Sequence, residues 1–180
     1  MGRRPSINRD EVLALAERIV AERGAAALTI EAVAHAAGIS KGGVQSCFGT
    51  KEAMIGAMLD RWFQDYAAGV TAALDGAPGG LAARMAAHLA LSLDATDGSP
   101  ARGASLLAAL LQHPEQLHAV RAWYAERFAG LFEAGEAGRA LRLALLAIEG
   151  AVLLRHFGLA RLPPAEWAVL REDIATLIRV

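Results

Sequence analysis

Small and polar side chains fill one short segment of the sequence, residues 40–47, and their chemistry is that of binding rather than of catalysis. A lysine can neutralise a phosphate, and a glutamine can pair with an adenine edge or a phosphate oxygen. The small residues between them leave a helix slim enough to enter the major groove of DNA. The residues of this segment that we expect to contact DNA are Ser40, Lys41, Gly42, Gly43, Gln45, Ser46 and Cys47.

The same segment overlaps Gly38–Gly42, which reads GISKG and matches the G-x-S-x-G pattern of a hydrolase nucleophile elbow. Such an elbow follows a strand and rests on a sheet, whereas Val33–Ala37 is helical in composition. A capping serine between two turn glycines explains the pattern. A small helical enzyme is the least favoured hypothesis, because the sequence also shows no paired nucleophile and base and no phosphate loop. We expect no enzyme and no cofactor.

The five histidines do not have the spacing of metal ligands. His113 and His118 lie five positions apart and would diverge on a helix. We therefore expect structural or surface roles for them and no metal site. The lone Cys47 leaves two interpretations open, an oxidation sensor or a small packing residue.

The residues around this segment predict two short helices joined by a tight turn. Thr29 can cap the first helix, and Gly38 supplies the left-handed position that ends it. Ser40 then caps the second helix, so residues 29–51 read as a helix-turn-helix. An earlier helix should begin at a capping box of Asn8 and Glu11 and end at Gly24.

A long fourth helix is predicted to start after the cap Thr50 and to run to about Leu74. Its start places Lys51 beside the helix-turn-helix, where a cation can meet a phosphate. Lys41 and Lys51 are the two lysines of the chain, and Arg3 and Arg4 form a basic arm. We add Arg3, Arg4, Thr29 and Lys51 to the expected DNA contacts.

The segment also resembles a known family. The matching residues are Leu28–Thr29, Val33–Ala34, Ala37–Gly42, Phe48 and Lys51–Ala53. These residues match at fixed spacing, and over roughly residues 8–62 the chain resembles the tetracycline-repressor (TetR) family of bacterial transcription regulators. The resemblance implies that the second helix of the motif reads DNA and that the C-terminal helices form a four-helix dimer interface.

Two positions depart from the pattern of that family. Its members usually carry an aromatic residue, most often tyrosine, where this chain has Gln45, and commonly histidine where it has Cys47. DNA binding is expected to survive both changes, because glutamine can still pair with a base edge or a phosphate.

Composition predicts an all-α protein. The chain has 180 residues, of which 54% are hydrophobic, with few β-branched residues and a net charge of −1. No global basic field is present, so DNA affinity must be local. One cysteine, no signal peptide and no apolar run of membrane-spanning length predict a cytoplasmic protein.

Helix follows helix beyond the fourth, with breaks at glycine or proline. The predicted ranges are 81–93, 101–112, 115–133, 139–157 and a last helix after Pro163. This gives about nine helices. We expect two domains, a DNA-binding domain over residues 1–49 and a ligand-binding and dimerisation domain over residues 50–180.

Two groups of residues in the second domain are candidates for binding. Aromatic residues and methionine at helical spacing are usually core, but they can also line a cavity. The candidates for contact with a ligand are Trp62, Met85, His88, Leu107, Trp123, Tyr124, Phe128 and Glu149. The candidates for a dimer interface are Leu145, Ile148, Val152, Trp167, Leu170, Ile174 and Leu177. For Glu149 three interpretations stay open: a pair across the dimer, a ligand contact, or exposure to water.

These patterns favour a DNA-binding transcriptional regulator. The leading hypothesis is a homodimeric repressor that grips an inverted-repeat operator in double-stranded DNA and is released by a small, mostly hydrophobic effector. The alternative is a constitutive DNA-binding dimer without an effector. Neither hypothesis involves a membrane.

Overall fold

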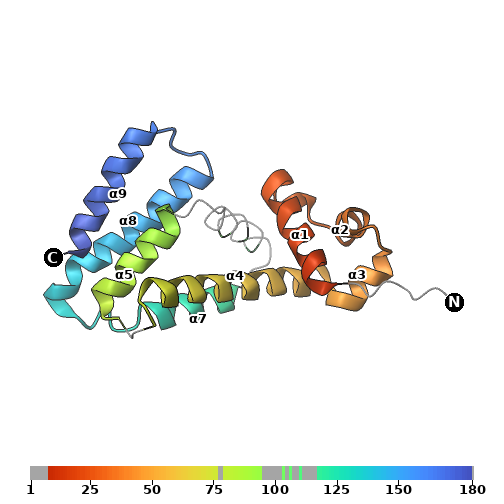
Figure 1. The fold of residues 1–180 in the computed structure, drawn as a ribbon, viewed down its shortest axis with the longest axis horizontal. Helices are drawn as coiled ribbons and strands as arrows, with labels where there is room; N and C mark the ends of the chain where they lie inside the picture. The colour runs from red at the N-terminus through yellow and green to blue at the C-terminus, as the bar shows by residue number, and fades with distance from the viewer. Residues whose placement is uncertain are drawn as a thin grey trace. The chain divides into compact units, whose positions relative to one another are not determined.

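The computed structural model describes residues 8–76, 79–94, 103, 106, 110 and 117–179. All regular secondary structure in these ranges is helical, as the sequence predicts (Figure 1). The α-helices are α1 (Arg9–Arg23), α2 (Ile30–Ala37), α3 (Lys41–Phe48), α4 (Lys51–Ala73), α5 (Leu81–Leu89), α7 (Leu117–Arg127), α8 (Arg139–His156) and α9 (Pro164–Ile178). Within the described ranges, no helix combines the length and apolarity that a membrane span requires.

The chain divides into two compact units. The first unit comprises Met1–Trp62 and Ser105–Leu117, and the second comprises Phe63–Ala104 and His118–Val180. The first twelve residues of α4, up to Trp62, therefore cluster with the helix-turn-helix. The domain boundary predicted after residue 49 remains a prediction, because compactness alone does not define where an activity resides.

Side-chain caps start the helices of the first unit. The side-chain oxygens of Asn8, Thr29, Ser40 and Thr50 accept hydrogen bonds, 3.0–3.4 Å long, from backbone N–H groups two or three residues later. These contacts satisfy donors that a helix N-terminus otherwise leaves unpaired. All four caps were predicted from the sequence.

The turn of the motif depends on Gly38, which has φ 64° and ψ 28°. This left-handed conformation is strained for residues with a Cβ, so glycine ends α2 here. Behind the turn, Val33 and Val44 are fully buried and fill the angle between α2 and α3. Ile39 is only half-buried. The burial of Val33 and Val44 therefore fixes how α3 presents its other face.

Arg61 ties α4 to α1 within the first unit. Its guanidinium lies 3.1 Å from a carboxylate oxygen of Asp10 and 3.7 Å from one of Glu17. It also donates to the backbone carbonyl of Asp10 at 3.2 Å. These polar contacts therefore hold α1 against the first half of α4.

In the second unit α5, α8 and α9 pack side by side (Figure 1). Their shared core contains fully buried Ile148 together with residues from all three helices. The other buried members are Met85, Leu89, Leu131, Leu141, Ala144, Ile174, Ala175 and Ile178. This core buries apolar side chains of α5, α8 and α9 together.

Two predicted helices differ from the structure or lie outside its description. The helix predicted over 115–133 ends at Arg127, because Gly130 adopts φ 84° and turns the chain. The turn places Leu131 in the core with no exposed surface. Most of the helix predicted over 101–112 lies outside the described residues; Leu106 and Leu110, which are described, are buried.

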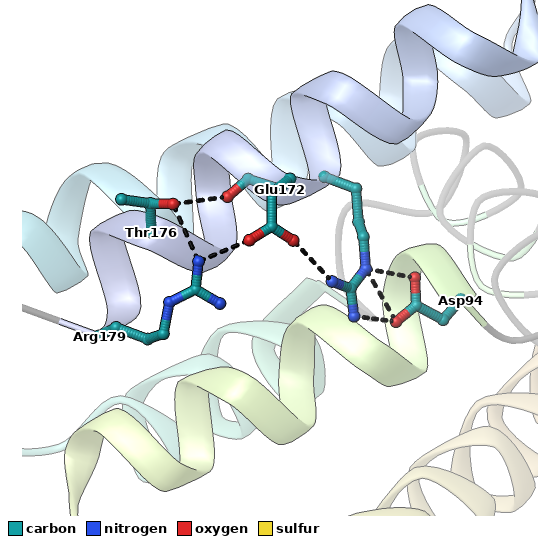
Figure 2. A network of polar contacts seen from close by, with 5 residues as sticks. Asp94, Glu172, Thr176 and Arg179 are labelled. Atoms are coloured by element: carbon teal, nitrogen blue, oxygen red, sulfur yellow. Dashed lines mark hydrogen bonds and ion pairs between the residues drawn. The ribbon is translucent and has the colours of Figure 1, made fainter.

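A π-helical segment, Ala90–Asp94, extends α5 and is held by charged groups of α8 and α9. Arg171 binds the Asp94 carboxylate in a bidentate pair at 2.7–3.1 Å, and Arg155 donates to the Leu93 carbonyl at 3.2 Å. Figure 2 shows how the network continues along α9, where Arg179 lies 2.6 Å from Glu172. The network fixes the end of the π-helix, although exposed ion pairs stabilise the fold by at most about 1 kcal/mol each.

Candidate nucleic-acid interface and buried polar cluster

The exposed face of α3 carries the predicted DNA contacts. Gln45 and Ser46 are exposed, and Val44 and Phe48 anchor the helix from its buried side. Cys47 is half-buried. The helix thus presents a small polar surface, and its residues remain predicted DNA contacts.

The two lysines differ in their surroundings. The Lys41 ammonium lies 3.0 Å from a carboxylate oxygen of Glu31, and both side chains are mostly exposed. Such a pair is weak, about 1 kcal/mol or less, so a DNA phosphate can displace Glu31. Lys51 is half-buried in the first turn of α4, beside the backbone N–H groups that a phosphate binds at a helix N-terminus.

Two further positions define what α3 can contact. At Gly42 the nearest atom to an added Cβ would be the Ser40 hydroxyl at 3.8 Å, and Gly43 is half-buried. Ser40 and Thr29 use their side-chain oxygens as helix caps, and their hydroxyl hydrogens stay available as donors. The predicted contacts Arg3 and Arg4 lie outside the described residues.

Arg9 is a residue of this surface whose role the sequence did not reveal. Its guanidinium lies 4.8 Å from the centre of the Phe48 ring, and its Nε donates to the Cys47 carbonyl at 3.4 Å. A cation at this position also suits the negative end of α3. Arg9 therefore braces the reading helix from α1, a contact between distant segments that spacing cannot show.

The second unit buries a polar cluster around His88, which is 3% exposed. The His88 Nδ1 atom lies 2.7 Å from the Tyr66 hydroxyl, and Nε2 lies 3.1 Å from a Glu149 carboxylate oxygen. Glu149 also accepts from Tyr124, and burial together with this carboxylate raises the pKa of Tyr124. Glu149 therefore pairs within its own chain, an arrangement that was not among the three interpretations of the sequence.

Aromatic rings enclose this cluster. The Phe128 ring lies 5.4 Å from the His88 ring, and Trp123 lies 4.9 Å from Tyr66 and 5.4 Å from Phe63. Burial is the main cause that raises the pKa of Tyr66, so its phenol stays protonated. The cluster combines a fixed imidazole with ring faces, and such a combination suits recognition of a small organic molecule.

The predicted ligand contacts are only partly brought together. His88, Trp123, Tyr124, Phe128 and Glu149 form the cluster described above, whereas Met85 packs in the apolar core of α5, α8 and α9. Trp62 belongs to the first unit, and Leu107 lies outside the described residues.

Tyr66, Arg84 and Arg127 adjoin the cluster but were absent from the prediction. A sequence signal did exist for the two arginines. Arg84 lies four residues before His88, and Arg127 lies four residues after Trp123, so each shares a helix face with a predicted contact.

The predicted dimer residues fall into two groups. Ile148 and Ile174 are buried in the core of the chain itself and cannot contact a partner, because their helical faces point inward. Leu145, Val152, Trp167 and Leu177 are half-buried, and Leu170 is exposed. The large apolar side chains that remain exposed are Leu143, Leu146, Leu153 and Leu154 on α8, Phe157 directly after it, and Val169 and Leu170 on α9.

No cluster of three potential metal ligands occurs among residues that the structure describes. His88 is buried as part of the polar cluster, and His35 and His118 are exposed. His113 lies outside the described ranges.

Comparison with known proteins gives a consistent result for both units. Residues 12–58 match the family model of bacterial regulatory proteins of the tetR family, and residues 82–179 match that of the tetracyclin repressor-like C-terminal domain. No curated protein matches the chain by sequence.

Two solved structures illustrate the shared fold. A transcriptional regulator from Rhodococcus sp. Rha1 is 24% identical, with a TM-score of 0.63 over 96% of this chain and 94% of that protein. AmtR of Mycobacterium smegmatis is 21% identical, with a TM-score of 0.57 over 100% of this chain and 90% of that protein. At this identity the likeness establishes the fold. The two family matches, one on each side of residue 60, show that the chain belongs to the TetR family of DNA-binding transcriptional regulators.

Proposed function

We propose that the protein is a cytoplasmic homodimeric repressor that binds an inverted-repeat operator and leaves it when a small, mostly hydrophobic effector binds the second unit. The observation that carries the proposal is the exposed Gln45 and Ser46 surface of α3, set between Lys41 and Lys51. Two such surfaces, about 34 Å apart in a dimer, would reach successive major grooves.

Gln45 and Lys51 are assigned different tasks in this proposal. Lys51 binds a phosphate, so Lys51→Ala should weaken binding to all DNA sequences by a similar factor. It should also lower the salt slope, the steepness with which the logarithm of the binding constant falls with the logarithm of the salt concentration, by about one. Gln45 reads a base, so Gln45→Ala should relax preference at one position of each half-site. Binding to a randomised DNA library at several salt concentrations measures both effects.

Arg121→Ala is the matched control for loss of a positive charge, because Arg121 is an exposed arginine of the second unit. It should leave operator affinity and the salt slope as they are. An unchanged slope for Lys51→Ala would remove Lys51 from the interface. A uniform loss for Gln45→Ala would make it a phosphate contact.

The exposed apolar side chains of α8 and α9 supply the dimer interface of the proposal. Leu146 is 70% exposed in the single chain, more than any other of these side chains. Leu146→Asp should therefore give a monomer with poor operator affinity. Phe132, 74% exposed and outside both helices, provides the control, because Phe132→Asp should leave the dimer intact in sedimentation.

Release by an effector follows from α4, which carries Lys51 at its start and Tyr66 further along the same helix. A molecule that displaces Tyr66 can thereby alter the position of Lys51, and such coupling must be reciprocal. Gel shifts of the upstream DNA of the gene, with and without metabolite extracts, test the release. Binding that no extract reverses would favour the constitutive DNA-binding dimer.

A further inference from the structure

A small cavity lies in the second unit beside the buried polar cluster. Its volume is about 130 Å³, and the residues that line it are Tyr66, Val70, Arg84, Glu126, Arg127 and Phe128. A cavity of roughly 150 Å³ is known to hold a benzene ring. The size therefore fits a single ring or a short aliphatic chain.

Two guanidinium groups reach this cavity from different helices, Arg84 from α5 and Arg127 from α7. Neither forms an ion pair with a carboxylate in the described part of the chain. The Nε atoms of both are buried and lack a hydrogen-bond partner among the same residues. Burying part of a guanidinium group without an acid partner costs desolvation free energy. Binding of an anion between the two groups would offset this cost.

The contacts that Arg84 and Arg127 do make leave most of their donors unused. Arg127 lies 5.0 Å from the centre of the Tyr66 ring and 5.1 Å from that of Trp123, contacts that hold the charge against aromatic faces. Arg84 donates to the Ala129 carbonyl at 3.5 Å, a long hydrogen bond. Glu126 is the one acid of the lining, and its side chain is exposed.

We infer that this cavity binds a small organic carboxylate whose acidic group pairs with Arg84 and Arg127. The apolar part of the molecule packs against Tyr66, Val70 and Phe128. Arginine suits this task, because its planar donors match the two oxygens of a carboxylate. The inference rests on the proposed function, since it assigns a chemical class to the effector, but binding can be measured without DNA.

Calorimetry on the full-length protein provides the first test. The probes are benzoate and hexanoate, their neutral amides benzamide and hexanamide, and inorganic phosphate. At least one acid should bind about 10- to 100-fold more tightly than its amide, because the amide has the same shape without the charge. Phosphate, which lacks an apolar part, should bind more weakly than that acid.

Three outcomes of the calorimetry would overturn the inference. One is equal affinity of acid and amide, and another is phosphate binding as tight as that of the acids. The third is the absence of binding by either acid up to about 10 mM, a concentration at which even weak specific pairs are detected.

Substitutions locate the binding. Arg84→Gln and Arg127→Gln should each lower the affinity for the acid about 10- to 100-fold. Arg121→Gln, an exposed arginine on the same helix as Arg127, should change nothing. Glu126→Gln should strengthen binding about two- to threefold, because it removes a like charge from the rim.

A folded double variant of Arg84 and Arg127 that binds the acid like the unaltered protein would refute the site. Should these variants fail to fold in circular dichroism, the comparison of acid and amide on the unaltered protein decides the question alone.

Operator release separates this inference from the proposed function. One outcome is that the acid binds, with lower affinity in the variants, while the operator complex persists. That result would support the carboxylate site and contradict the proposed release of the operator by an effector. If neutral ring compounds release the operator and no acid binds, the release stands and the inference about charge fails.

Discussion

The helices of the first unit begin with side-chain caps, whereas those of the second unit rely on contacts between distant segments. Asn8, Thr29, Ser40 and Thr50 each cap the helix that follows them. In contrast α5, α8 and α9 start without any side-chain cap hydrogen bond. The difference teaches that local signals define the helices that carry the predicted DNA contacts, while packing and buried polar pairs define the second unit.

The largest effect should come from removing α9, which tests whether packing sustains the second unit. Ending the chain after Leu162 removes Ile174, Ala175 and Ile178 and exposes the core around Ile148. The second unit should unfold or aggregate, with loss of the dimer. Sedimentation and circular dichroism measure this result, and an intact folded dimer would contradict the comparison.

Glu149→Ala should destabilise the protein by about 2–3 kcal/mol, because it leaves a buried histidine nitrogen without its partner. Glu149→Gln keeps an acceptor in place and should cost less. Urea unfolding followed by circular dichroism gives both values. If Glu149→Ala is neutral, buried polar pairs do not hold the second unit.

Two glycines compare the units directly. A Cβ at Gly138 would lie 2.7 Å from the Leu131 carbonyl oxygen, a backbone atom that cannot easily move. Gly138→Ala should therefore cost about 2 kcal/mol. A Cβ at Gly56, in the first unit, meets nothing within 4 Å, and Gly56→Ala should stabilise α4 by about 0.5–1 kcal/mol. Thermal unfolding should show a lower stability for Gly138→Ala and a higher stability for Gly56→Ala. Changes of the same sign in both variants would weaken the contrast between the two units.

The smallest effect concerns pH and the second unit. Burial, and to a lesser degree Arg155, lowers the pKa of His156 in α8. The unfolded chain then binds the proton more tightly, so stability is full above about pH 6.5 and falls as the pH drops further. His156→Gln should flatten this slope in urea titrations between about pH 7 and 5. If the free energy of unfolding of the variant depends on pH as before, groups other than His156 cause that dependence.

Sequence signals predicted the first unit more completely than the second. The caps, Gly38 and the exposed face of α3 depend on residues within a few positions of one another, so spacing reveals them. The pairing of His88 with Glu149 joins α5 to α8, and Arg9 reaches α3 from α1. No periodicity encodes such contacts. For the same reason, Ile148 and Ile174 could not be assigned to the core of the chain or to a partner from their helical faces alone.

The open space at Gly42 bears on how such a regulator can acquire a new operator. A Cβ added there would meet only the Ser40 hydroxyl at 3.8 Å, so at least an alanine fits on α3 without repacking the fold. Gly42 is the second residue of α3, and replacing a glycine within a helix also favours the helix by up to roughly 0.5–1 kcal/mol. If α3 reads DNA as proposed, position 42 is a point at which selection can retarget the protein at little cost to folding. A library varied at this single codon, selected against altered half-sites, would show how far one residue can change the promoter it recognises.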